Sequence, residues 1–519
     1  MHTVPAIHRP VPLHHHAPHG MLRPSIEDDA VSTTPSTRTG AWGRTQAVDA
    51  VLLGLLAIAL RIPAFLADTA LHFDDGTYGL SAVAMRTGNA PFVSVYSSQG
   101  PVFLPLLHLF DVLGFERMDS PRLLPVLAGA AIAIGVYRIA SMLTDRGGAL
   151  LAGALAAASG VVMWTTAPIT SDGVALTFAV FAVAEALNHR SRPATHRAVV
   201  VALIIGAAVG TKSLLSGPAI LVAWIIVASS RRWRDTVVVP IVAAAFAVAT
   251  AVPWGVRAVY EQSIAYHSTV EGRHDVLANW HKAMSTLGRR DLTMLVLAAV
   301  AAGGGLVAWL RRDRTAGAED AALLDRWFGG DRFLWWWLLL GFVTLAVDPA
   351  MWRNHVNILA PPLALLIACH RPSWRVVAVV LVVTVPLQMV SLRALYRPEP
   401  YRGAEAVARD AARAIPASAW ALTDTGGYVW RAGRATAPWY VDPSILRIET
   451  PVDSIRITSA SIARVAARPR VCLVLITSPV RWGSFADLPA RLAEDGYRKV
   501  APLGPGTLGV YRRPCRSAR

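Results

Sequence analysis

The sequence predicts a polytopic α-helical membrane protein that carries a small α/β domain at its C-terminal end. The 519-residue chain is 54% hydrophobic and has a mean hydropathy of +0.42. Only 16% of its residues are charged, well below the roughly 25% of soluble domains. Apolar runs long enough to cross ~30 Å of hydrocarbon recur from residue 48 to residue 392, and the composition turns polar after that.

Residues 1–45 are rich in Pro, His, Ser and Thr and show no apolar period. We expect a disordered cytoplasmic tail. It is too long for the charged leader of a usual signal peptide, so the first span is expected to be a retained anchor. Metal binding by the tail's histidines is the alternative to a solvated low-complexity segment, and these are His8, His14, His15, His16 and His19.

The first apolar run, residues 48–66, follows Arg44, so the positive-inside rule places the N-terminus in the cytoplasm. We expect about eleven spans within a transmembrane domain of residues 46–396, and the odd number places the C-terminal end outside. The remaining spans are expected at residues 123–143, 149–166, 174–187, 198–227 (as two), 237–254, 292–310, 334–347, 356–368 and 376–392. The shorter run 101–115 contains prolines and is expected to be interfacial or re-entrant.

Residues 198–227 form an apolar stretch with one charge, Lys212, near the middle and arginine clusters beyond both ends. A single crossing would place one arginine cluster outside and bury Lys212 at mid-bilayer, at a cost of ~3 kcal/mol. Two short crossings of about 14 residues, or about 20 Å each, avoid both problems. We therefore expect the chain to reverse at Lys212, which would lie in a cavity below the outer surface.

From residue 397 onward the composition is that of a soluble domain, and residues 397–519 are predicted to form an extracytoplasmic α/β domain. Strands are expected at residues 420–423, 471–476 and 508–511, and helices at residues 402–415 and 487–497. This segment contains no nucleophile elbow, P-loop or metal motif.

The net charge of +16 and the pI near 10.5 are typical of nucleic-acid-binding proteins. Here the basic residues lie mostly in short loops between apolar runs, so the positive-inside rule explains them and we predict no nucleic-acid partner. The three cysteines, Cys369, Cys472 and Cys515, lack metal-ligand spacing. We expect free thiols, and a pairing of Cys472 with Cys515 is the alternative for an exported segment.

Charged side chains gather at the expected outer ends of the spans. They are Asp74, Asp75, Asp172, Lys212, Arg353 and His355. Placing a carboxylate near a bilayer costs free energy, so such residues usually have a function. Carboxylates suit activation of a hydroxyl nucleophile or binding of a metal ion. Cations suit a phosphate. Together they indicate transfer from a lipid phosphate at the outer boundary of the membrane.

Five motifs, in order, carry a family resemblance. They are Asp74-Asp75-Gly76-Thr77-Tyr78, the span-opening Asp172, Gly206 to Thr211-Lys212, Pro253-Trp254, and Arg353-Asn354-His355 before Pro361-Pro362. With these motifs, residues 48–369 resemble the GT-C superfamily of membrane glycosyltransferases, in the branch of the protein O-mannosyltransferases and the lipid A aminoarabinose transferases. The resemblance implies a polyprenyl-phosphate sugar as donor and an active site that faces away from the cytoplasm.

The resemblance and the charges together predict the role of each residue. Asp74 is expected to be the general base for an acceptor hydroxyl, with Asp75 and Asp172 orienting the acceptor or sugar. The leaving phosphate is expected on three side chains, Lys212, Arg353 and His355. Tyr78 and Tyr96 are expected to line the cavity, with ordinary packing as an equal alternative. One base suffices for a single displacement, so we expect inversion.

Two positions depart from the family pattern. The second acid is Asp75 instead of Glu, and the family's Glu-Lys-Pro-Pro stands here as Ser98-Gln99-Gly100-Pro101. The change removes an acid and a lysine that could bind a metal or the donor phosphate. We assign no metal ligands, and a divalent ion, the sugar and the acceptor stay open.

Simpler roles exist for the same side chains. The acids are good helix caps, Lys212 can snorkel to the interface, and Arg353 and His355 can anchor a span there. Two other functions stay open as well, a secondary transporter with Asp172 and Lys212 as coupled charges and a non-catalytic scaffold. The sequence contains no internal repeat, and its charges lie near one face of the membrane, which favours the enzyme.

Overall fold

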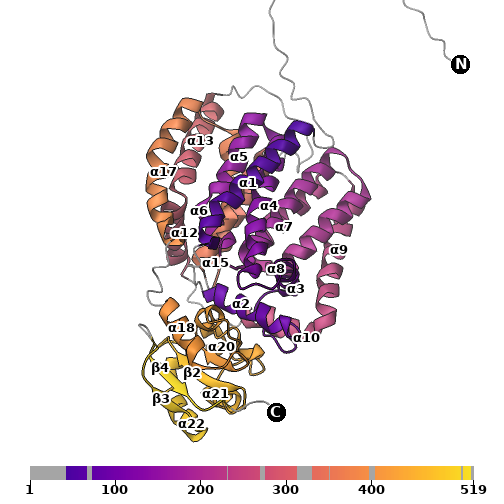
Figure 1. Ribbon diagram of the computed structural model, residues 1–519. Coiled ribbons are helices and arrows are strands. Elements are labelled where there is room, and N and C mark those ends of the chain that lie inside the picture. Colours follow the sequence, from indigo (N-terminus) through magenta and orange to yellow (C-terminus); the bar gives the residue numbers. More distant parts are fainter. Residues whose placement is uncertain are drawn as a thin grey trace, which may run out of the picture. The chain divides into compact units, whose positions relative to one another are not determined.

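The computed structural model describes residues 43–66, 73–230, 232–268, 275–311, 330–349, 351–396, 404–503 and 507–515 (Figure 1). The expected N-terminal tail therefore lies outside the described residues up to residue 42, and so does most of the loop expected between residues 311 and 332.

Every apolar run expected to span the membrane is helical. These helices are α1 (Arg44–Leu66), α4 (Leu123–Leu143), α5 (Arg146–Ala158), α6 (Gly160–Thr166), α7 (Ser171–Ser191), α8 (Thr195–Ala228), α9 (Trp233–Ala251), α13 (Leu292–Arg311), α15 (Arg332–Val347), α16 (Ala360–Cys369) and α17 (Trp374–Tyr396). The structure thus confirms a polytopic helical membrane fold.

The expected count of about eleven spans is not confirmed. Within the described ranges, six helices are long and apolar enough to cross a membrane, or seven if the pair α5 and α6, bent by 53°, forms one span. Within the same ranges, four shorter apolar segments of 10–17 residues lie at Phe103–Leu113, Leu215–Ala228, Leu292–Gly303 and Arg332–Val347.

The reversal expected at Lys212 is confirmed. The backbone of Lys212 leaves the helical region (φ −158°, ψ 101°) and divides α8 into two halves. The Ser216 hydroxyl donates to the carbonyl of Ala208 (3.3 Å), eight residues earlier, which requires a sharp bend. At the far ends, Arg232 donates to the carbonyl of Pro193 (2.9 Å), so the two halves lie side by side with both arginine clusters at one end.

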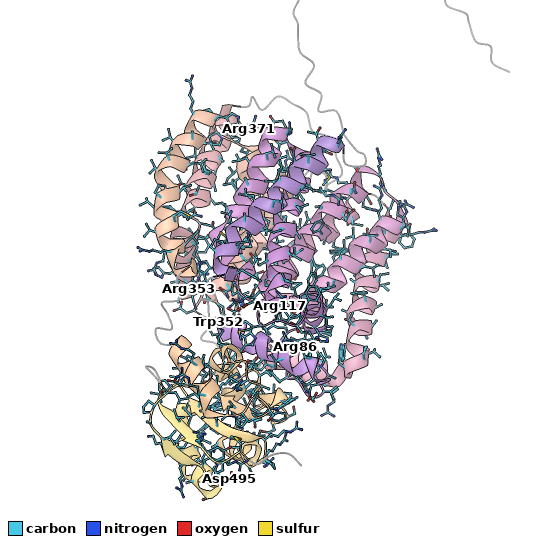
Figure 2. The ribbon with its side chains drawn as sticks, in the orientation of Figure 1. Arg86, Arg117, Trp352, Arg353, Arg371 and Asp495 are labelled. Carbon is cyan, nitrogen blue, oxygen red and sulfur yellow. A yellow bond between two sulfur atoms is a disulfide. The ribbon has the colours of Figure 1, made fainter. Side chains whose placement is uncertain are left out.

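Short helices connect the long ones at the end of the bundle that carries Arg353 (Figure 2). They are α2 (Phe73–Arg86), α3 (Phe103–Leu113), η1 (Ser120–Arg122), η2 (Val252–Trp254), α10 (Val256–Tyr260), the π-helix η3 (Glu261–Ala265), α11 (Tyr266–Ser268), α12 (Val276–Arg290) and η4 (Arg353–Leu359). The expected interfacial segment 101–115 corresponds to α3, and α12 is amphipathic with an exposed Trp280.

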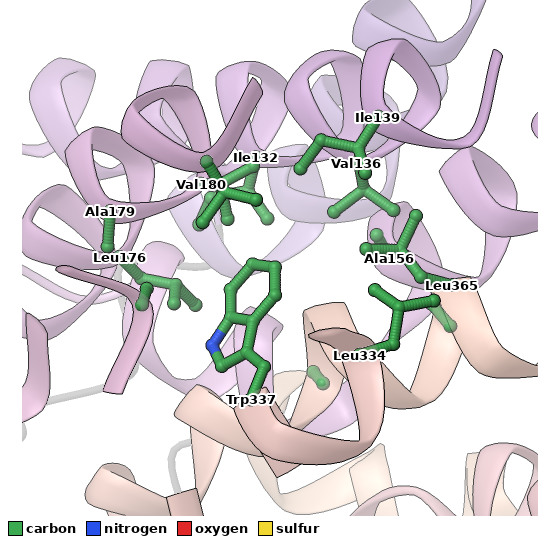
Figure 3. Packing of buried hydrophobic residues seen from close by; sticks show 14 of the residues in the cluster. Ile132, Val136, Ile139, Ala156, Leu176, Ala179, Val180, Leu334, Trp337 and Leu365 are labelled. Atoms are coloured by element: carbon green, nitrogen blue, oxygen red, sulfur yellow. The ribbon is translucent and has the colours of Figure 1, made fainter. Parts of the chain in front are cut away.

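Small residues allow the helices of the bundle to approach closely around a shared apolar core. Trp337 of α15 is fully buried against Ile132 and Val136 of α4, Val180 of α7 and Leu365 of α16 (Figure 3). Large apolar side chains of α9 and α17 point outward instead, and only 17% of the α9 span is buried. A surface of this kind is stable against lipid and not against water.

The C-terminal residues form a four-stranded sheet in the order β1-β2-β4-β3. The helices and strands of this C-terminal domain are α18 (Ala404–Ala414), β1 (Trp420–Thr423), α19 (Gly426–Arg431), η6 (Pro438–Tyr440), α20 (Ile445–Glu449), α21 (Ser459–Ala466), β2 (Val471–Ile476), η7 (Trp482–Ser484), α22 (Leu488–Glu494), β3 (Arg498–Val500) and β4 (Gly509–Arg512). β1 pairs with β2 in parallel, with Leu422 opposite Val474, and β4 runs antiparallel to β2 and β3.

Cys472 and Cys515 form a disulfide, so the expectation of free thiols for them was wrong. Cys472 lies in the buried strand β2, and Cys515 follows β4, the strand that pairs with β2. The two Cα atoms are 5.1 Å apart, within the normal range for a disulfide. Only strand pairing brings these residues together across 43 positions, and spacing alone does not reveal it.

Helix α2 is the base on which the C-terminal domain packs. A Cβ atom on Gly76 would lie 2.1 Å from the backbone nitrogen of Gly427, and one on Gly79 would lie 2.4 Å from the ring of Trp430. These glycines allow α19 to cross α2 in direct backbone contact. One apolar cluster runs through this junction and includes Phe103 of α3.

Candidate active site

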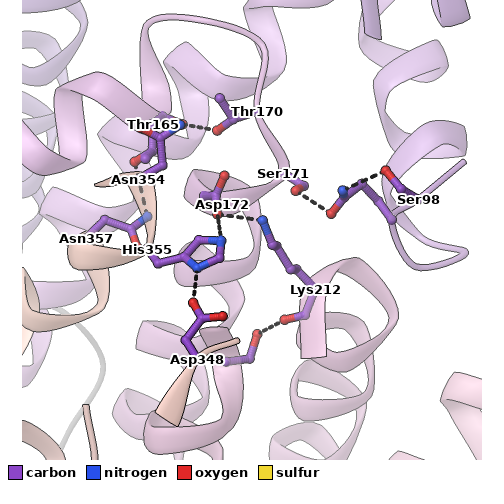
Figure 4. Close-up of polar contacts among 12 residues, drawn as sticks. Ser98, Thr165, Thr170, Ser171, Asp172, Lys212, Asp348, Asn354, His355 and Asn357 are labelled. Atoms are coloured by element: carbon purple, nitrogen blue, oxygen red, sulfur yellow. Dashed lines mark hydrogen bonds and ion pairs between the residues drawn. The ribbon is translucent and has the colours of Figure 1, made fainter. Parts of the chain in front are cut away.

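Four ionisable side chains, three of them buried and one partly buried, form a chain at the end of the bundle (Figure 4). The Lys212 ammonium lies 2.8 Å from Oδ1 of Asp172, in the first turn of α7. His355 Nε2 lies 4.0 Å from the same oxygen, and its Nδ1 pairs with the carboxylate of Asp348. A buried ion pair without compensating groups is unfavourable, so such an arrangement is usually retained for function.

The break in α8 explains how Lys212 reaches this position. Because its backbone is extended, the side chain leaves the α8 hairpin at the tip and points toward α7. The hydroxyl of Ser216 donates to the Lys212 carbonyl (2.8 Å), which satisfies a backbone group at the break.

Asp74 lies half-buried in the first turn of α2 and receives neither a hydrogen bond nor an ion pair from the described residues. Burial, and next the charge of Asp172, raise the pKa of Asp74 to about 7, against the opposing charge of Lys212. Asp442 and Asp75 raise it further. A carboxylate that receives no hydrogen bond from the described residues and has a pKa near neutrality suits proton transfer.

Asp75 occupies a different environment. It is fully buried, accepts a hydrogen bond from the backbone of Ile169 (2.7 Å) and pairs with Arg122 (3.3 Å). Arg122 also lies over the ring of Trp430, 5.3 Å from its centre. Both oxygens of Asp75 are therefore engaged, which ties α2 to the loop before α7 and to the C-terminal domain.

Arg353 is exposed and has no contact with Lys212 or Asp172 among the described residues. It lies instead near Lys282 and Arg290 of α12, whose pKa values are lowered by burial and next by the charge of Arg353. The Arg290 guanidinium stacks 4.2 Å from the ring centre of Trp164. The expected phosphate-binding residues thus form two groups, one around Lys212 and His355 and one around Arg353.

The two predicted cavity tyrosines lie apart. Tyr78 is buried, packs edge-on against Phe103 (4.8 Å between ring centres), and has a pKa raised first by burial and then by the charge of Asp74. Tyr96 lies at the junction with the C-terminal domain, where the Arg447 guanidinium stacks on its ring at 3.7 Å. Tyr78 therefore borders Asp74, and Tyr96 packs between the two parts of the chain.

Three residues of this region were missed at the sequence level. Asp348 directly follows the apolar run 334–347, the position relative to a span that identified Asp74. Gln99 accepts a hydrogen bond from Ser171 (2.7 Å), and Asp442 accepts one from Ser98 (3.1 Å). No sequence signal marks Asp442, which arrives from the C-terminal domain. In the described part of the chain, no three His, Cys, Asp or Glu side chains are grouped to hold a metal ion.

Comparisons with known proteins found a family match for part of the sequence and solved structures with a similar fold. A sequence model of the family dolichyl-phosphate-mannose-protein mannosyltransferase matches residues 98–256, which include Asp172 and Lys212. No curated protein matches the sequence. The structure is similar to ArnT from Cupriavidus metallidurans in the apo state and bound to undecaprenyl phosphate, each with a TM-score of 0.58, 13% identity, and coverage of 90% of this chain and 98% of the other.

The archaeal oligosaccharyltransferase AglB from Archaeoglobus fulgidus, in complex with an inhibitory peptide and a dolichol-phosphate, matches with a TM-score of 0.48 and 12% identity, over 91% of this chain and 74% of that one. The ArnT likeness and the family match confirm the resemblance to the GT-C superfamily and the GT-C membrane fold. They support a membrane glycosyltransferase.

Proposed function

We propose that this chain is an integral membrane glycosyltransferase that moves a sugar from a polyprenyl-phosphate donor to an acceptor hydroxyl at the outer face of the membrane. One observation carries the proposal. A carboxylate with a pKa of about 7 and a free face, Asp74, lies near the buried Asp172–Lys212 pair. The fold similarity to ArnT, solved with undecaprenyl phosphate, supports the choice of donor.

Asp74 acts as the general base in this proposal. It removes the proton of the acceptor hydroxyl while the bond from the sugar to the phosphate oxygen breaks, a contribution of ~10²–10⁴ in rate. Asp172 holds the acceptor in place. Asp75, whose two oxygens are engaged, holds the surrounding site in place. Asp75 and Asp172 are both engaged with cations, so neither is free to act as a nucleophile, and single displacement with inversion is the expected course.

The leaving phosphate is held by Lys212 and His355, whose charge stabilises the negative charge that develops on the phosphate oxygens. The second group, around Arg353, attracts the anionic donor from the side of α12, where apolar side chains face outward. Tyr78 lines the space beside Asp74.

The active site faces away from the cytoplasm in this proposal. Arg371 lies at the end of the bundle opposite Arg353, and the paired ends of α8 carry arginines, as the positive-inside rule requires of a cytoplasmic side (Figure 2). The Cys472–Cys515 disulfide is typical of an exported domain. The protein would therefore reside in the cell membrane with its C-terminal domain outside.

The decisive experiment is mass spectrometry of polyprenyl-phosphate sugars and envelope glycans in a strain that lacks the protein. We expect one polyprenyl-phosphate sugar to accumulate and one glycan to lose that sugar, and wild-type protein but not Asp74→Asn restores both. Unchanged lipids and glycans would contradict the proposal.

The buried Asp172–Lys212 pair also suits a secondary transporter, where the two side chains would be coupled charges. In that case proteoliposomes would accumulate a solute in response to an ion gradient, and sugar transfer would be absent.

A further inference from the structure

The C-terminal domain contributes a carboxylate to the region of the active site. Asp442 follows η6 in the C-terminal domain and is 4% exposed. Its Oδ2 accepts a hydrogen bond from the hydroxyl of Ser98 in the membrane part (3.1 Å), and its Oδ1 accepts one from its own loop, from the backbone of Ser444 (3.0 Å). Burial of a carboxylate at a junction between two parts of a chain costs free energy that hydrogen bonds must offset, so its presence here points to a specific role.

The loop that carries Asp442 is fixed against the membrane part. The Arg447 guanidinium donates to the carbonyls of Asp442 and Trp439 (2.8 Å each) and stacks on the ring of Tyr96. The hydroxyl of Tyr266 bonds to that of Ser444 (2.7 Å). These contacts hold the backbone of the loop in one place, so the position of the Asp442 carboxylate is defined.

A chain of hydrogen bonds runs from Asp442 to Ser171, the residue before Asp172. Ser171 donates to the Gln99 amide oxygen (2.7 Å), and the Gln99 amide nitrogen donates to Ser98 (3.2 Å), which donates to Asp442. Ser171 precedes Asp172 directly. Every donor points toward Asp442, so the negative charge of Asp442 terminates the chain and sets its direction.

The same segment also positions Lys212. The backbone nitrogen of Gly100 donates to the carbonyl of Thr211 (3.1 Å), and that of Val102 donates to Gly210 (2.8 Å). A Cβ atom on Gly100 would lie 2.2 Å from the Gly210 oxygen, so only glycine permits this approach. Residues 97–102 therefore join Asp442 on one side to Ser171 and Thr211 on the other, the residues directly before Asp172 and Lys212.

We propose that Asp442 is a positioning residue of the transferase site, through which the C-terminal domain completes the catalytic centre. It holds the segment 97–102 and thereby orients Asp172 and Lys212. This inference rests on the proposed function and adds to it that the membrane part alone is catalytically incomplete.

The test compares Asp442→Asn, which keeps the shape but removes the charge, with Asp442→Glu, which keeps the charge. Asp453→Asn is the matched control, because Asp453 lies in the same domain and its side chain is 93% exposed. We expect Asp442→Asn to lower kcat by about tenfold or more, since small misplacements of catalytic groups reduce rates strongly. Asp442→Glu should recover part of the loss, and Asp453→Asn should match wild type.

A second readout does not depend on turnover. A hydrophobic carbodiimide modifies protonated carboxyl groups, so mass spectrometry of the Asp74 peptide against pH reports the pKa of Asp74 in the full-length protein. Among the described residues, the ionisable groups that act electrostatically on Asp74 include Asp75, Asp172, Asp442, Lys212, Tyr78 and Tyr266. In Asp442→Asn the labelling midpoint should fall by about half a pH unit or more, because one like charge is removed. In Asp442→Glu it should stay near the wild-type value.

Wild-type turnover together with an unchanged labelling midpoint in Asp442→Asn would overturn the inference. If wild type transfers sugar, Asp74→Asn does not, and Asp442→Asn behaves as wild type, the proposed function stands and this inference fails. If wild type does not transfer sugar, the labelling still decides whether Asp442 faces Asp74. Should Asp442→Asn fail to fold, Ser98→Ala breaks the same chain without a charge change, and unchanged kcat in that folded variant would overturn the inference.

Discussion

At the scale of single residues, Asp74 and Asp75 show how neighbours acquire different roles. Both are in the first turn of α2, yet Asp75 is neutralised by Arg122 while Asp74 accepts nothing from the described residues. The helix turns by about 100° per residue, which sends one carboxylate into the packed junction and the other toward Asp172. The sequence predicted the general base at Asp74 and an orienting role for Asp75, but it did not reveal that Asp75 is buried against Arg122.

The first prediction concerns Asp74→Asn. Asparagine keeps the shape of the side chain but does not accept a proton at neutral pH, so kcat should fall by ~10²–10⁴. Donor affinity should change little, because Lys212 and His355 are intact. Single-turnover assays and donor binding in nanodiscs provide the measurement, and turnover near the wild-type level would remove Asp74 from the mechanism.

The second prediction is the pH dependence of the reaction. The pKa of Asp74 is raised to about 7 by burial and by the charge of Asp172. The base is therefore protonated and inactive below that pH, and kcat/KM should rise as the pH increases through about 7. The rise should be absent from the residual activity of Asp74→Asn. A profile that is flat between pH 5 and pH 8 would show that another group serves as the base.

Titration of Asp74 should lower the free energy of unfolding as the pH rises, whereas it should increase the activity. The native state holds the proton up to about pH 7, whereas the unfolded chain loses it near 3.8, so this group makes the fold less stable as the pH rises between the two values. Asp74→Asn should therefore raise Tm at pH 8 and leave it unchanged at pH 3. Thermal melts in one detergent at both pH values test this, with the exposed Asp453→Asn as control.

At the scale of elements, apolar length predicted every long helix, and charge placement predicted the reversal of α8. The sheet strands β1 and β2 were predicted with their observed bounds, because both are short buried runs. The polar edge strand β3, all of whose residues are exposed, gave no such signal. The helix α2 was not expected either, since its packing face is made largely of glycines and small polar residues.

The sequence predicted the site residues that lie at the ends of apolar spans. It did not predict the arrangement that tertiary contacts create. Arg353 and His355 were expected to act together, but they lie two residues apart in the 3₁₀ helix η4, so their side chains point about 120° apart around the helix axis. His355 therefore turns inward to Asp348 while Arg353 joins α12. Asp442 could not be predicted from the sequence, because only the folded position of the C-terminal domain brings it to the site.

The third prediction concerns the tip of the α8 hairpin. Lys212→Ala should weaken donor binding by ~10- to 150-fold if a charge-assisted phosphate contact is lost. The same change leaves Asp172 buried without its lysine, which lowers the free energy of unfolding by about 3–5 kcal/mol. Lys212→Met with Asp172→Asn removes both charges and should restore stability while donor affinity stays low. Unchanged donor affinity in a folded single variant would show that this lysine does not bind phosphate.

At the scale of the whole molecule, the described residues of the bundle and the C-terminal domain share apolar clusters and a chain of hydrogen bonds. The disulfide fixes the last described strand of that domain to its central strand β2. The placement of the domain relative to the membrane therefore decides on which side the site opens, and a single topological experiment tests the site and the function together.

The fourth prediction is that the N-terminus is inside and the C-terminal domain outside. Arg371 lies at the end of the bundle opposite Arg353, the paired ends of α8 bring arginines together, and basic flanks remain in the cytoplasm. Alkaline phosphatase fused after Arg402 should be active, and the same enzyme fused after Ala41 should be inactive. In the full-length protein, a membrane-impermeant maleimide should label Cys515 in whole cells only after reduction, because the disulfide is formed outside and Cys472 is buried in β2. The loss of this disulfide in Cys472→Ser with Cys515→Ser should lower stability by about 2–4 kcal/mol without changing the topology. A cytoplasmic signal from the Arg402 fusion, with free thiols in untreated cells, would place Asp74 and Lys212 on the wrong side for an external acceptor.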